Sequence, residues 1–512
     1  MLAQCSLFSA TISGVNACLV RVEVTIGSGL PGFIIVGMPD AAIQEARERI
    51  KSALKSSGFD VPQKKIVVNL APGSLRKSGS GFDLPIALCI LQATGQIQLD
   101  NLEEALFVGE LSLDGSIRSV PGSLAYEICA KEHRCAIVLP HDSDDLLPLS
   151  DLSIKKVSHL NDFREGLLAE ASFEPSCTKQ NKKDFAEISG LSHVKRACQI
   201  AAAGSLGLLM VGPPGAGKTM LSSRMPSILP PMPEDDLYEV AQIHSVAGLD
   251  ISGIRNFERP FRSPHHSSTL VSLVGGGRPI KPGEISLAHK GILFLDELAE
   301  FPSHVLQSLR QPLESKEIVI NRTHEQVCMP ADFMLVAATN PCPCGYWGDG
   351  ECACSCSAAR IEHYQSKIGG PLLDRIDLHI NLKRSKSKDL FSHEKTQSSA
   401  QLQEGIILAH EFRKMREEKS LSASKQLSIR DYLDFFTINS DAQQLLKSCV
   451  DSLFLSGRSI MSTLKISRII ADIAQKEEVD AQMVAEALSF RQSSLGSGHN
   501  RIVQASLRRD FL

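Results

Sequence analysis

The first third of the chain alternates between strand-like and helix-like patterns of apolar residues. Residues 17–26 end in an alternation of apolar and polar side chains that is typical of a strand. Asp40 stands before a charged stretch that runs to Gly58, and this predicts a capped helix. Residues 1–165 are therefore expected to form one α/β domain. Its other expected elements are strands at 65–70 and 136–140 and helices after Asp83 and near Ala125.

Two further segments follow this domain. Residues 170–184 are polar and include Pro175, so residues 166–184 are expected to be a linker. Residues 185–382 repeat the strand–helix alternation and predict a second α/β domain. Residues 383–512 begin with a polar stretch and then show a mostly helical pattern. The predicted fold class is α/β multidomain, with helices at the C-terminal end.

Composition agrees with this division. A length of 512 residues fits about three domains. A content of 43% hydrophobic and 22% charged residues excludes collagen, low-complexity chains and small disulfide scaffolds. The net charge is -4, with +4 on residues 383–512 and -8 on the rest. No strong basic field indicates a nucleic-acid partner, although a local basic patch is compatible with this total.

No targeting or membrane segment is expected. The apolar residues before Arg21 follow no basic region and are interrupted by polar side chains, unlike a signal peptide. The uncharged run 197–217 has the length of a membrane span but ends in glycines and prolines. Of the 14 cysteines, five lie between Cys342 and Cys356 and nine are scattered. This distribution predicts a cytoplasmic protein with one metal site.

Residues 212–219 match the G-x-x-x-x-G-K-[ST] pattern of a phosphate-binding loop, and the apolar run 206–211 supplies the preceding strand. Glycines let backbone N–H groups wrap a phosphate, and the following helix adds a positive dipole. We therefore expect Lys218 to bind the β- and γ-phosphates of ATP and Thr219 to ligate Mg²⁺. The expected loop is Gly212, Pro213, Pro214, Gly215, Ala216, Gly217, Lys218 and Thr219.

Two carboxylates, Asp296 and Glu297, follow an apolar strand about 75 residues later. Asp296 would hold Mg²⁺, and Glu297 would polarise the attacking water. Asn340, at the end of the apolar strand 333–339, can position the same water. A surface turn and a polar strand cap are the alternatives, and the upstream phosphate loop favours the hydrolytic interpretation.

The segment 342–356 contains two C-x-C pairs separated by a turn with several glycines. Four thiolates from two short turns suit tetrahedral Zn²⁺. Cys352 could replace one of them, and a set of reduced thiols is the alternative. We expect one structural Zn²⁺ per chain. Its predicted ligands are Cys342, Cys344, Cys354 and Cys356.

Several longer motifs point to a family. They are FRSPHH at 261–266, GGG at 275–277, PGEISLAH at 282–289, NPCPCGY at 340–346 and GPLLDRID at 370–377. With the phosphate loop, they resemble the AAA+ ATPases of the magnesium-chelatase/MCM branch. LPGF at 30–33 and VGMPD at 36–40 narrow the resemblance to the ComM/YifB-type family, over nearly the whole chain.

This resemblance implies an AAA+ P-loop NTPase core with a parallel sheet and a C-terminal helical lid. It implies ATP-hydrolysing homo-oligomers, expected as hexameric rings, that drive branch migration of DNA junctions in recombination, notably natural transformation. Recombinase-associated proteins are expected partners. The resemblance also implies a helix-2 insertion around 271–282 and a pre-sensor hairpin around 314–329, both facing the pore. Their candidate DNA phosphate contacts are Arg278, Lys281, Lys316 and Arg322, although isolated basic residues are more often solvated.

Arginines complete the expected site. Arg375, flanked by acids, would usually form a salt bridge, but in ring ATPases an arginine here reaches the neighbouring subunit's γ-phosphate. Arg458 lies where related proteins place their second sensor arginine on ATP, and Arg468 is the second candidate. A salt bridge on a helix surface is the alternative for this position.

The first domain resembles the Lon protease fold, through GELSLDGSIR at 109–118. Lon-type proteases need a serine activated by a lysine. Here Gly81 takes the nucleophile's place and Leu124 the lysine's place, while Ser80 stands one residue away. We therefore expect a binding or assembly platform without the Ser/Lys dyad.

Two other functions share the core motifs. One is the ATPase subunit of a metal chelatase, and the other is an ATP-dependent protease or protein-remodelling enzyme. Chelatase subunits lack the Lon-like first domain, and the missing dyad argues against the protease. Stimulation of ATP hydrolysis by DNA would separate the motor from both.

Overall fold

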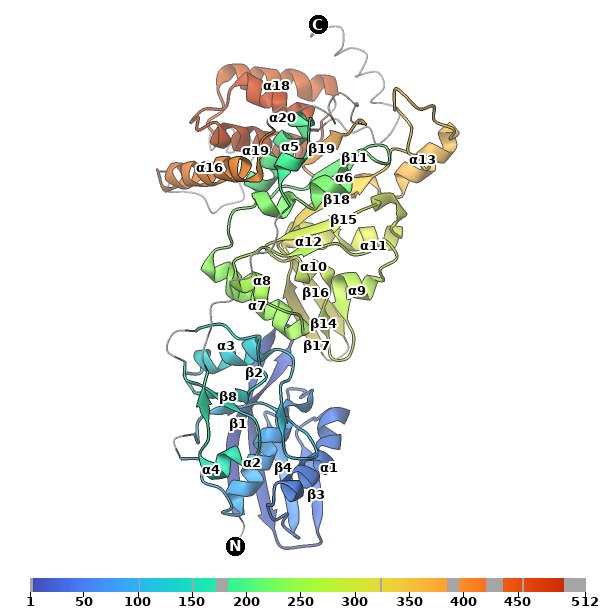
Figure 1. Cartoon of the computed structure of the whole chain (residues 1–512). Helices are drawn as coiled ribbons and strands as arrows, with labels where there is room; N and C mark the ends of the chain where they lie inside the picture. Colours follow the sequence, from blue (N-terminus) through green and yellow to red (C-terminus); the bar gives the residue numbers. More distant parts are fainter. Residues whose placement is uncertain are drawn as a thin grey trace.

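The computed structural model describes residues 3–100, 102–149, 152–171, 183–322, 325–384, 396–419, 436–453 and 455–491. Figure 1 shows three parts stacked along the long axis of the molecule. The N-terminal part lies at the bottom, the part that carries the phosphate loop lies in the middle, and the C-terminal helices lie at the top.

The N-terminal part is built on an eight-stranded mixed sheet with the order β10-β9-β8-β5-β1-β2-β4-β3. Asp40 caps α1, because its Oδ1 accepts a hydrogen bond of 3.0 Å from the backbone of Ile43. The strands are β1 (Ala3–Ser13), β2 (Asn16–Gly27), β3 (Gly32–Val36), β4 (Lys65–Ala71), β5 (Leu106–Phe107), β8 (Ile137–Pro140), β9 (Ile154–Val157) and β10 (Ala169–Glu170). A small ladder joins β6 (Glu110–Leu111) to β7 (Ile117–Arg118), and the helices are α1 (Ala41–Ser56), α2 (Asp83–Ala93), α3 (Ser123–Glu132) and α4 (Asp162–Glu165).

Two features of this part differ from the sequence-based expectation. The sheet continues past the expected domain boundary at 165, because β10 pairs antiparallel with β9 through Ala169 and Glu170. The long strand β1 was not predicted; it pairs with β2 over its whole length. Of the expected linker 166–184, residues 172–182 lie outside the described residues.

The middle part contains the predicted parallel sheet. Its order is β12-β15-β18-β11-β19, and all four neighbouring pairs are parallel. The strands are β11 (Leu208–Val211), β12 (Phe261–Arg262), β15 (Ile292–Leu295), β18 (Met334–Thr339) and β19 (Leu378–Asn381). Its helices are α5 (Ser192–Gly204), α6 (Lys218–Ser222), α7 (Glu234–Ala247), α8 (Ser252–Arg255), α9 (Leu270–Val274), α10 (Glu284–Leu287), α11 (Ser303–Ser308), α12 (Arg310–Ser315), α13 (Ala358–Ser366) and α14 (Gly370–Leu373).

Two β-hairpins extend from this part toward the N-terminal part. One joins β13 (Gly275–Gly276) to β14 (Lys281–Pro282), and the other joins β16 (Glu317–Arg322) to β17 (Glu325–Pro330). Ile280 and Val327, one from each hairpin, share a buried cluster with Val15 of the β1–β2 turn. In Figure 1 the labels β14 and β17 lie at the boundary with the N-terminal part, with β17 at the height of α3. The hairpins thus lie between the two α/β parts.

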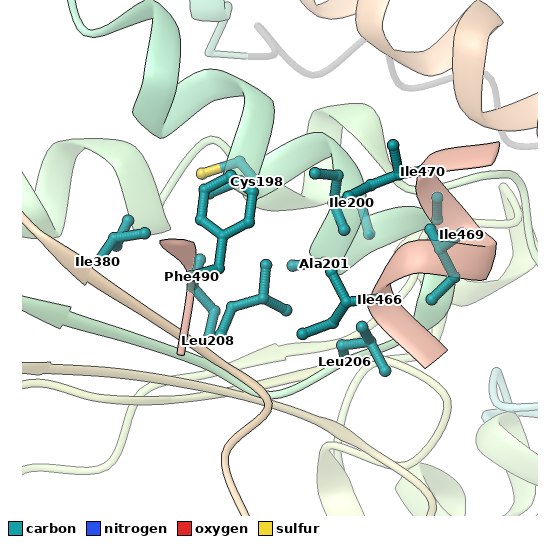
Figure 2. Packing of buried hydrophobic residues seen from close by; sticks show 14 of the residues in the cluster. Cys198, Ile200, Ala201, Leu206, Leu208, Ile380, Ile466, Ile469, Ile470 and Phe490 are labelled. Carbon is teal, nitrogen blue, oxygen red and sulfur yellow. The ribbon is translucent and has the colours of Figure 1, made fainter. Parts of the chain in front are cut away.

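The C-terminal helices cover the middle part through one shared core. They are α16 (Ser399–Lys419), α18 (Ser440–Leu453), α19 (Gly457–Ile473) and α20 (Ala481–Ser489). Figure 2 shows α5 packed between the sheet and α19, with Ile200 and Ala201 facing Ile466 and Ile469. Burying this apolar surface joins the helices to the sheet. None of the helices in the described ranges is both long and apolar enough to cross a membrane.

A second contact joins the N-terminal part to α7. Leu124 and Leu147 of the N-terminal part are buried in one cluster with Leu237 and Val240 of α7. The backbone of Leu124 donates a hydrogen bond of 3.3 Å to Oγ of Ser245. The two α/β parts are therefore held together by apolar packing as well as by polar contacts.

Candidate nucleotide site, arginine cluster and cysteine knuckle

The structure brings the predicted phosphate-loop, acidic and asparagine residues to one edge of the parallel sheet. Lys218, Asp296 and Asn340 follow β11, β15 and β18, whose carboxyl ends meet at this edge. The Lys218 ammonium donates hydrogen bonds to the carbonyl of Gly212 at 2.7 Å and to Oδ1 of Asn340 at 3.0 Å. The asparagine thus lies next to the lysine that is expected to bind phosphate.

The predicted magnesium ligands are also adjacent. Oγ1 of Thr219 donates a hydrogen bond of 2.7 Å to Oδ2 of Asp296. A hydroxyl and a carboxylate in contact are oxygen ligands of the type that Mg²⁺ takes beside a bound nucleotide. Burial lowers the pKa of Lys218, and the charges of Asp296 and Glu297 oppose this shift. The residues present therefore fit Mg²⁺ and a polyphosphate.

The phosphate loop has the backbone that its glycines predict. Gly215 and Gly217 take φ values of +78° and +85°, which favour glycine. A β-carbon on Gly212 would lie 2.8 Å from the carbonyl oxygen of Leu382, so this position also requires glycine.

Glu297 makes a contact that sequence reasoning missed. Its Oε2 lies 3.2 Å from Nδ1 of His266. The His266 ring in turn lies beside that of His265, with centroids 4.0 Å apart. Glu297 also has a φ of +51°, which is a strained value for a residue with a side chain. Backbone strain of this kind is often found at active sites. The FRSPHH motif contained the signal, but it indicated only the family and gave no partner for the histidines.

Arg375 and Arg458 converge on Glu314 of α12. The Arg375 guanidinium lies 2.8 Å from the Glu314 carboxylate, and Arg458, at the start of α19, binds the same oxygen. These arginines hold the pKa of Glu314 below its ordinary value. The sequence analysis considered the two arginines separately, because no motif or spacing links positions 375 and 458 to position 314.

The second candidate for the sensor arginine has a structural role in the C-terminal helices. Arg468 is buried and lies 3.0 Å from Asp472. It also donates hydrogen bonds to backbone carbonyls, including that of Glu477 at 2.6 Å. Arg458 at the exposed start of α19 is therefore the better placed of the two for a ligand.

The four candidate DNA contacts lie in different environments. Arg278 and Lys281 are exposed on the β13–β14 hairpin. Lys316 lies at the base of the other hairpin, 3.0 Å from the carboxylate of Asp332. Arg322 ends β16, and its side chain lies outside the described part of the chain.

The four predicted zinc ligands form one cluster. The sulfur atoms of Cys342, Cys344, Cys354 and Cys356 lie within 4.8 Å of one another. Cys342 lies 3.3 Å from Cys344 and 3.7 Å from Cys354. Tetrahedral Zn²⁺ with Zn–S bonds of about 2.3 Å separates its sulfur ligands by about 3.8 Å, so the cluster fits this ion. Cys352 instead accepts a hydrogen bond of 3.6 Å from Arg384.

Known proteins match this chain over most of its length. Three families match: "Magnesium chelatase, subunit ChlI" over residues 184–390, "Subunit ChlI of Mg-chelatase" over 22–143, and "Magnesium chelatase, subunit ChlI C-terminal" over 396–491. The chain is 40% identical to the protein YifB of Salmonella typhimurium, over 93% of this chain and 95% of that protein. It is 38% identical to the competence protein ComM of Haemophilus influenzae, over 95% and 97%.

A third relative, the protein YifB of Escherichia coli, is 38% identical over 93% of this chain and 95% of its own length. Alignments over 93% to 95% of the chain extend over all three parts of the molecule. The predicted family is therefore confirmed: the chain belongs to the ComM/YifB-type family of magnesium-chelatase-like AAA+ proteins.

Proposed function

We propose that this protein is an ATP-driven DNA motor that moves branched recombination intermediates in the cytoplasm. The contact of Lys218 with Asn340, beside the Thr219–Asp296 pair, carries the ATPase part of the proposal. The similarity to a competence protein supports the DNA part and suggests work during natural transformation.

In this proposal, the residues of the sheet edge divide the work of ATP hydrolysis. Backbone N–H groups of 212–217 and the Lys218 ammonium bind the phosphates, while Thr219 and Asp296 would hold Mg²⁺. The metal supplies charge neutralisation on the phosphates when it is bound. Glu297 accepts a proton from the attacking water, and Asn340 orients that water. Oε2 of Glu297 is bonded to His266 in the structure, and we propose that this bond loosens when the carboxylate engages the water.

The arginine cluster supports a site shared between subunits. Arg375 and Arg458 bind Glu314 and make no contact with the phosphate loop among the interactions of the described residues. We propose that both arginines reach ATP bound to the next subunit of a hexameric ring, with Arg375 on the γ-phosphate. The C-terminal helices then act as the lid of the AAA+ core.

The two hairpins are the proposed DNA contacts. Arg278 and Lys281 are exposed and close in sequence to a glycine-rich turn, which suits contact with DNA phosphates. Lys316 and Arg322 are the other proposed contacts, of which Lys316 already has an acidic partner. Recombinase-associated proteins are the proposed protein partners.

The N-terminal part is proposed to be a Lon-like platform without protease activity. The hydroxyl of Ser80 donates to the carboxylate of Glu110, and the buried Lys77 donates to the carbonyl of Pro72. Leu124, at the position of the missing lysine, is buried against α7. Casein cleavage that disappears in Ser80→Ala would contradict this part of the proposal.

The cysteine cluster is proposed to hold one Zn²⁺ per chain. Metal analysis of freshly purified, undialysed protein tests this directly. A content near one zinc per chain is expected, and protein without zinc would contradict the assignment.

A magnesium-chelatase-like function is the second candidate, because all three matching families carry the name of subunit ChlI. In that case the ATPase would load metal or remodel a protein partner, and DNA would leave ATP hydrolysis unchanged.

The deciding experiment is branch migration on a labelled four-way junction with ATP and Mg²⁺. The wild-type protein should produce separated arms, and Lys218→Ala should produce none. If ATP is hydrolysed without product and without stimulation by DNA, the motor proposal fails and the chelatase-like function becomes the better explanation.

A further inference from the structure

The cysteine knuckle, residues 342–356, packs directly on the phosphate loop. A β-carbon added at Gly345 would lie 2.6 Å from Cδ and 3.2 Å from Cγ of Pro214. Gly345 itself has a φ of +85°, so a glycine both permits this turn and lets its backbone approach the loop. The contact joins two segments that lie more than 120 positions apart in the sequence.

The knuckle is also continuous with the asparagine of the nucleotide site. Asn340 binds Lys218, and Cys342 follows two positions later with no exposed surface. The carbonyl of the intervening Pro341 accepts a hydrogen bond of 2.9 Å from the side chain of Gln365. The knuckle therefore begins two positions after Asn340, and its turn lies against Pro214.

The sulfur cluster is what closes the knuckle. Sγ of Cys354 lies 3.5 Å from Sγ of Cys344 and 3.7 Å from that of Cys342, which joins the two halves of the segment. Four thiolates at this distance would repel one another in the absence of a cation, and Zn²⁺ would neutralise them and hold the four sulfur atoms together. Without the ion, no metal–sulfur bonds would join the turn that carries Gly345 to the half of the knuckle that carries Cys354.

We propose that metal bound by the four cysteines positions the phosphate loop and Asn340, so that ATP hydrolysis depends on occupancy of a site that touches neither ATP nor Mg²⁺. The proposal rests on the proposed ATPase and zinc site and adds a coupling between them. The cysteines and Gly345 are positioning residues, since each acts through Pro214 or Asn340.

The experiment compares five single variants with the wild-type chain, and one of them, Lys218→Ala, disables the proposed nucleotide site. Cys354→Ser removes a predicted ligand, and Cys352→Ser is its control, because Cys352 lies in the same knuckle but binds Arg384. Gly345→Ala presses on Pro214 with all four thiols kept. Gly348→Ala is its control, because Gly348 has a similar φ of +80° and has no atom within 4 Å of its added β-carbon.

Zinc content, binding of a fluorescent ATP analogue, ATP turnover and thermal unfolding are measured for each protein. Cys354→Ser should lose zinc and lower turnover by about 10- to 100-fold, as small misplacements of catalytic groups do. Gly345→Ala should keep zinc and lower turnover as well, while both controls keep both properties. Lys218→Ala should lose turnover and keep zinc, which shows that the dependence runs from the metal to the nucleotide site.

Failure of the coupling is distinguishable from failure of the proposed function. Wild-type turnover in zinc-free Cys354→Ser and in Gly345→Ala would overturn the coupling while leaving the ATPase intact. Wild-type protein without zinc would contradict the metal site, and with it the coupling. Wild-type protein that binds zinc and does not hydrolyse ATP would contradict the ATPase before any variant is measured.

Discussion

Nδ1 of His266 lies 3.2 Å from Oε2 of Glu297, the carboxylate proposed to accept the proton of the attacking water. His266 belongs to the loop between β12 and α9, and α9 leads into the β13–β14 hairpin. The side chain of Glu297 is therefore bonded to the segment that continues to Arg278 and Lys281. If the proposed contacts of the hairpin with DNA displace it, we expect His266 to move with it and the carboxylate to be released.

We expect His266→Ala to raise ATP hydrolysis measured without DNA by several-fold and to reduce its stimulation by DNA. The physical reason is that the variant removes the bond that holds Glu297 in the resting state. His304→Ala is a suitable control, because His304 is an exposed histidine of α11. If His266→Ala lowers ATP hydrolysis with and without DNA in the same proportion, the histidine supports the active geometry. The idea that His266 restrains Glu297 in the resting state would then be wrong.

The second prediction concerns Arg375. Arg375→Ala should bind ATP normally and hydrolyse it on the order of 10³-fold more slowly, the loss expected of an arginine that acts on the transferring phosphate. Mixing it with Lys218→Ala should restore part of the activity, because a site between the two kinds of subunit can hold both residues. No rescue at any mixing ratio would count against a shared site.

A matched variant tests the arginine cluster itself. Glu314→Gln keeps the shape of the side chain and removes the charge that binds Arg375 and Arg458. If these arginines act on the neighbouring subunit, the variant should retain ATP hydrolysis, because it leaves both guanidinium groups in place.

Much of the nucleotide site could be predicted from the sequence because its parts are local motifs. The phosphate loop, the acidic pair after β15 and the asparagine after β18 each follow an apolar strand, and parallel strands bring such ends to one edge. Contacts between distant segments could not be predicted. The pairing of Glu314 with two arginines and the approach of Gly345 to Pro214 depend on tertiary packing, which no spacing encodes.

The elements of the N-terminal part show the same limit. Asp40 before a charged amphipathic stretch predicted the start of α1, since a cap is a local signal. In contrast, β1 contains polar residues such as Ser9 and Thr11 that become fully buried in the sheet. Because these polar residues interrupt the apolar pattern, the sequence did not predict the strand β1.

The third prediction separates the candidate DNA contacts by their salt dependence. Arg278→Ala and Lys281→Ala should each weaken DNA binding and lower the slope of log K against log salt by about 1, because each removes one proposed phosphate contact. Lys316→Ala should change the slope less, since its ammonium already lies 3.0 Å from Asp332. Equal effects of all three variants would show that Lys316 exchanges Asp332 for a phosphate in the complex.

The last prediction concerns the contact between the two α/β parts. Glu127 of α3 is fully buried, and its Oε2 accepts a hydrogen bond of 3.2 Å from the backbone of Leu147. Its other oxygen has no partner among the described residues, as suits a protonated carboxyl. Burial raises the pKa of Glu127 to about 8, and the nearby charge of Asp145 adds to the shift, whereas the Leu147 hydrogen bond, Arg255 and Lys131 oppose it.

The sign of the pH dependence follows from this shift. Between the ordinary pKa of 4.5 and about 8, the folded chain keeps a proton that the unfolded chain has released. The free energy of unfolding therefore falls with rising pH in this range, by ~1.4 kcal/mol per pH unit from this group. The side chain in Glu127→Gln is uncharged at every pH, so the variant should not lose this stability as the pH rises. Its melting temperature at pH 8.5 should therefore be higher than that of the wild type. Glu132→Gln is the control, because Glu132 is exposed at the end of the same helix, and its melting temperature should follow the wild-type pH dependence. If the melting temperatures of Glu127→Gln and wild type change in parallel with pH, Glu127 is ionised in the folded protein and the prediction is wrong.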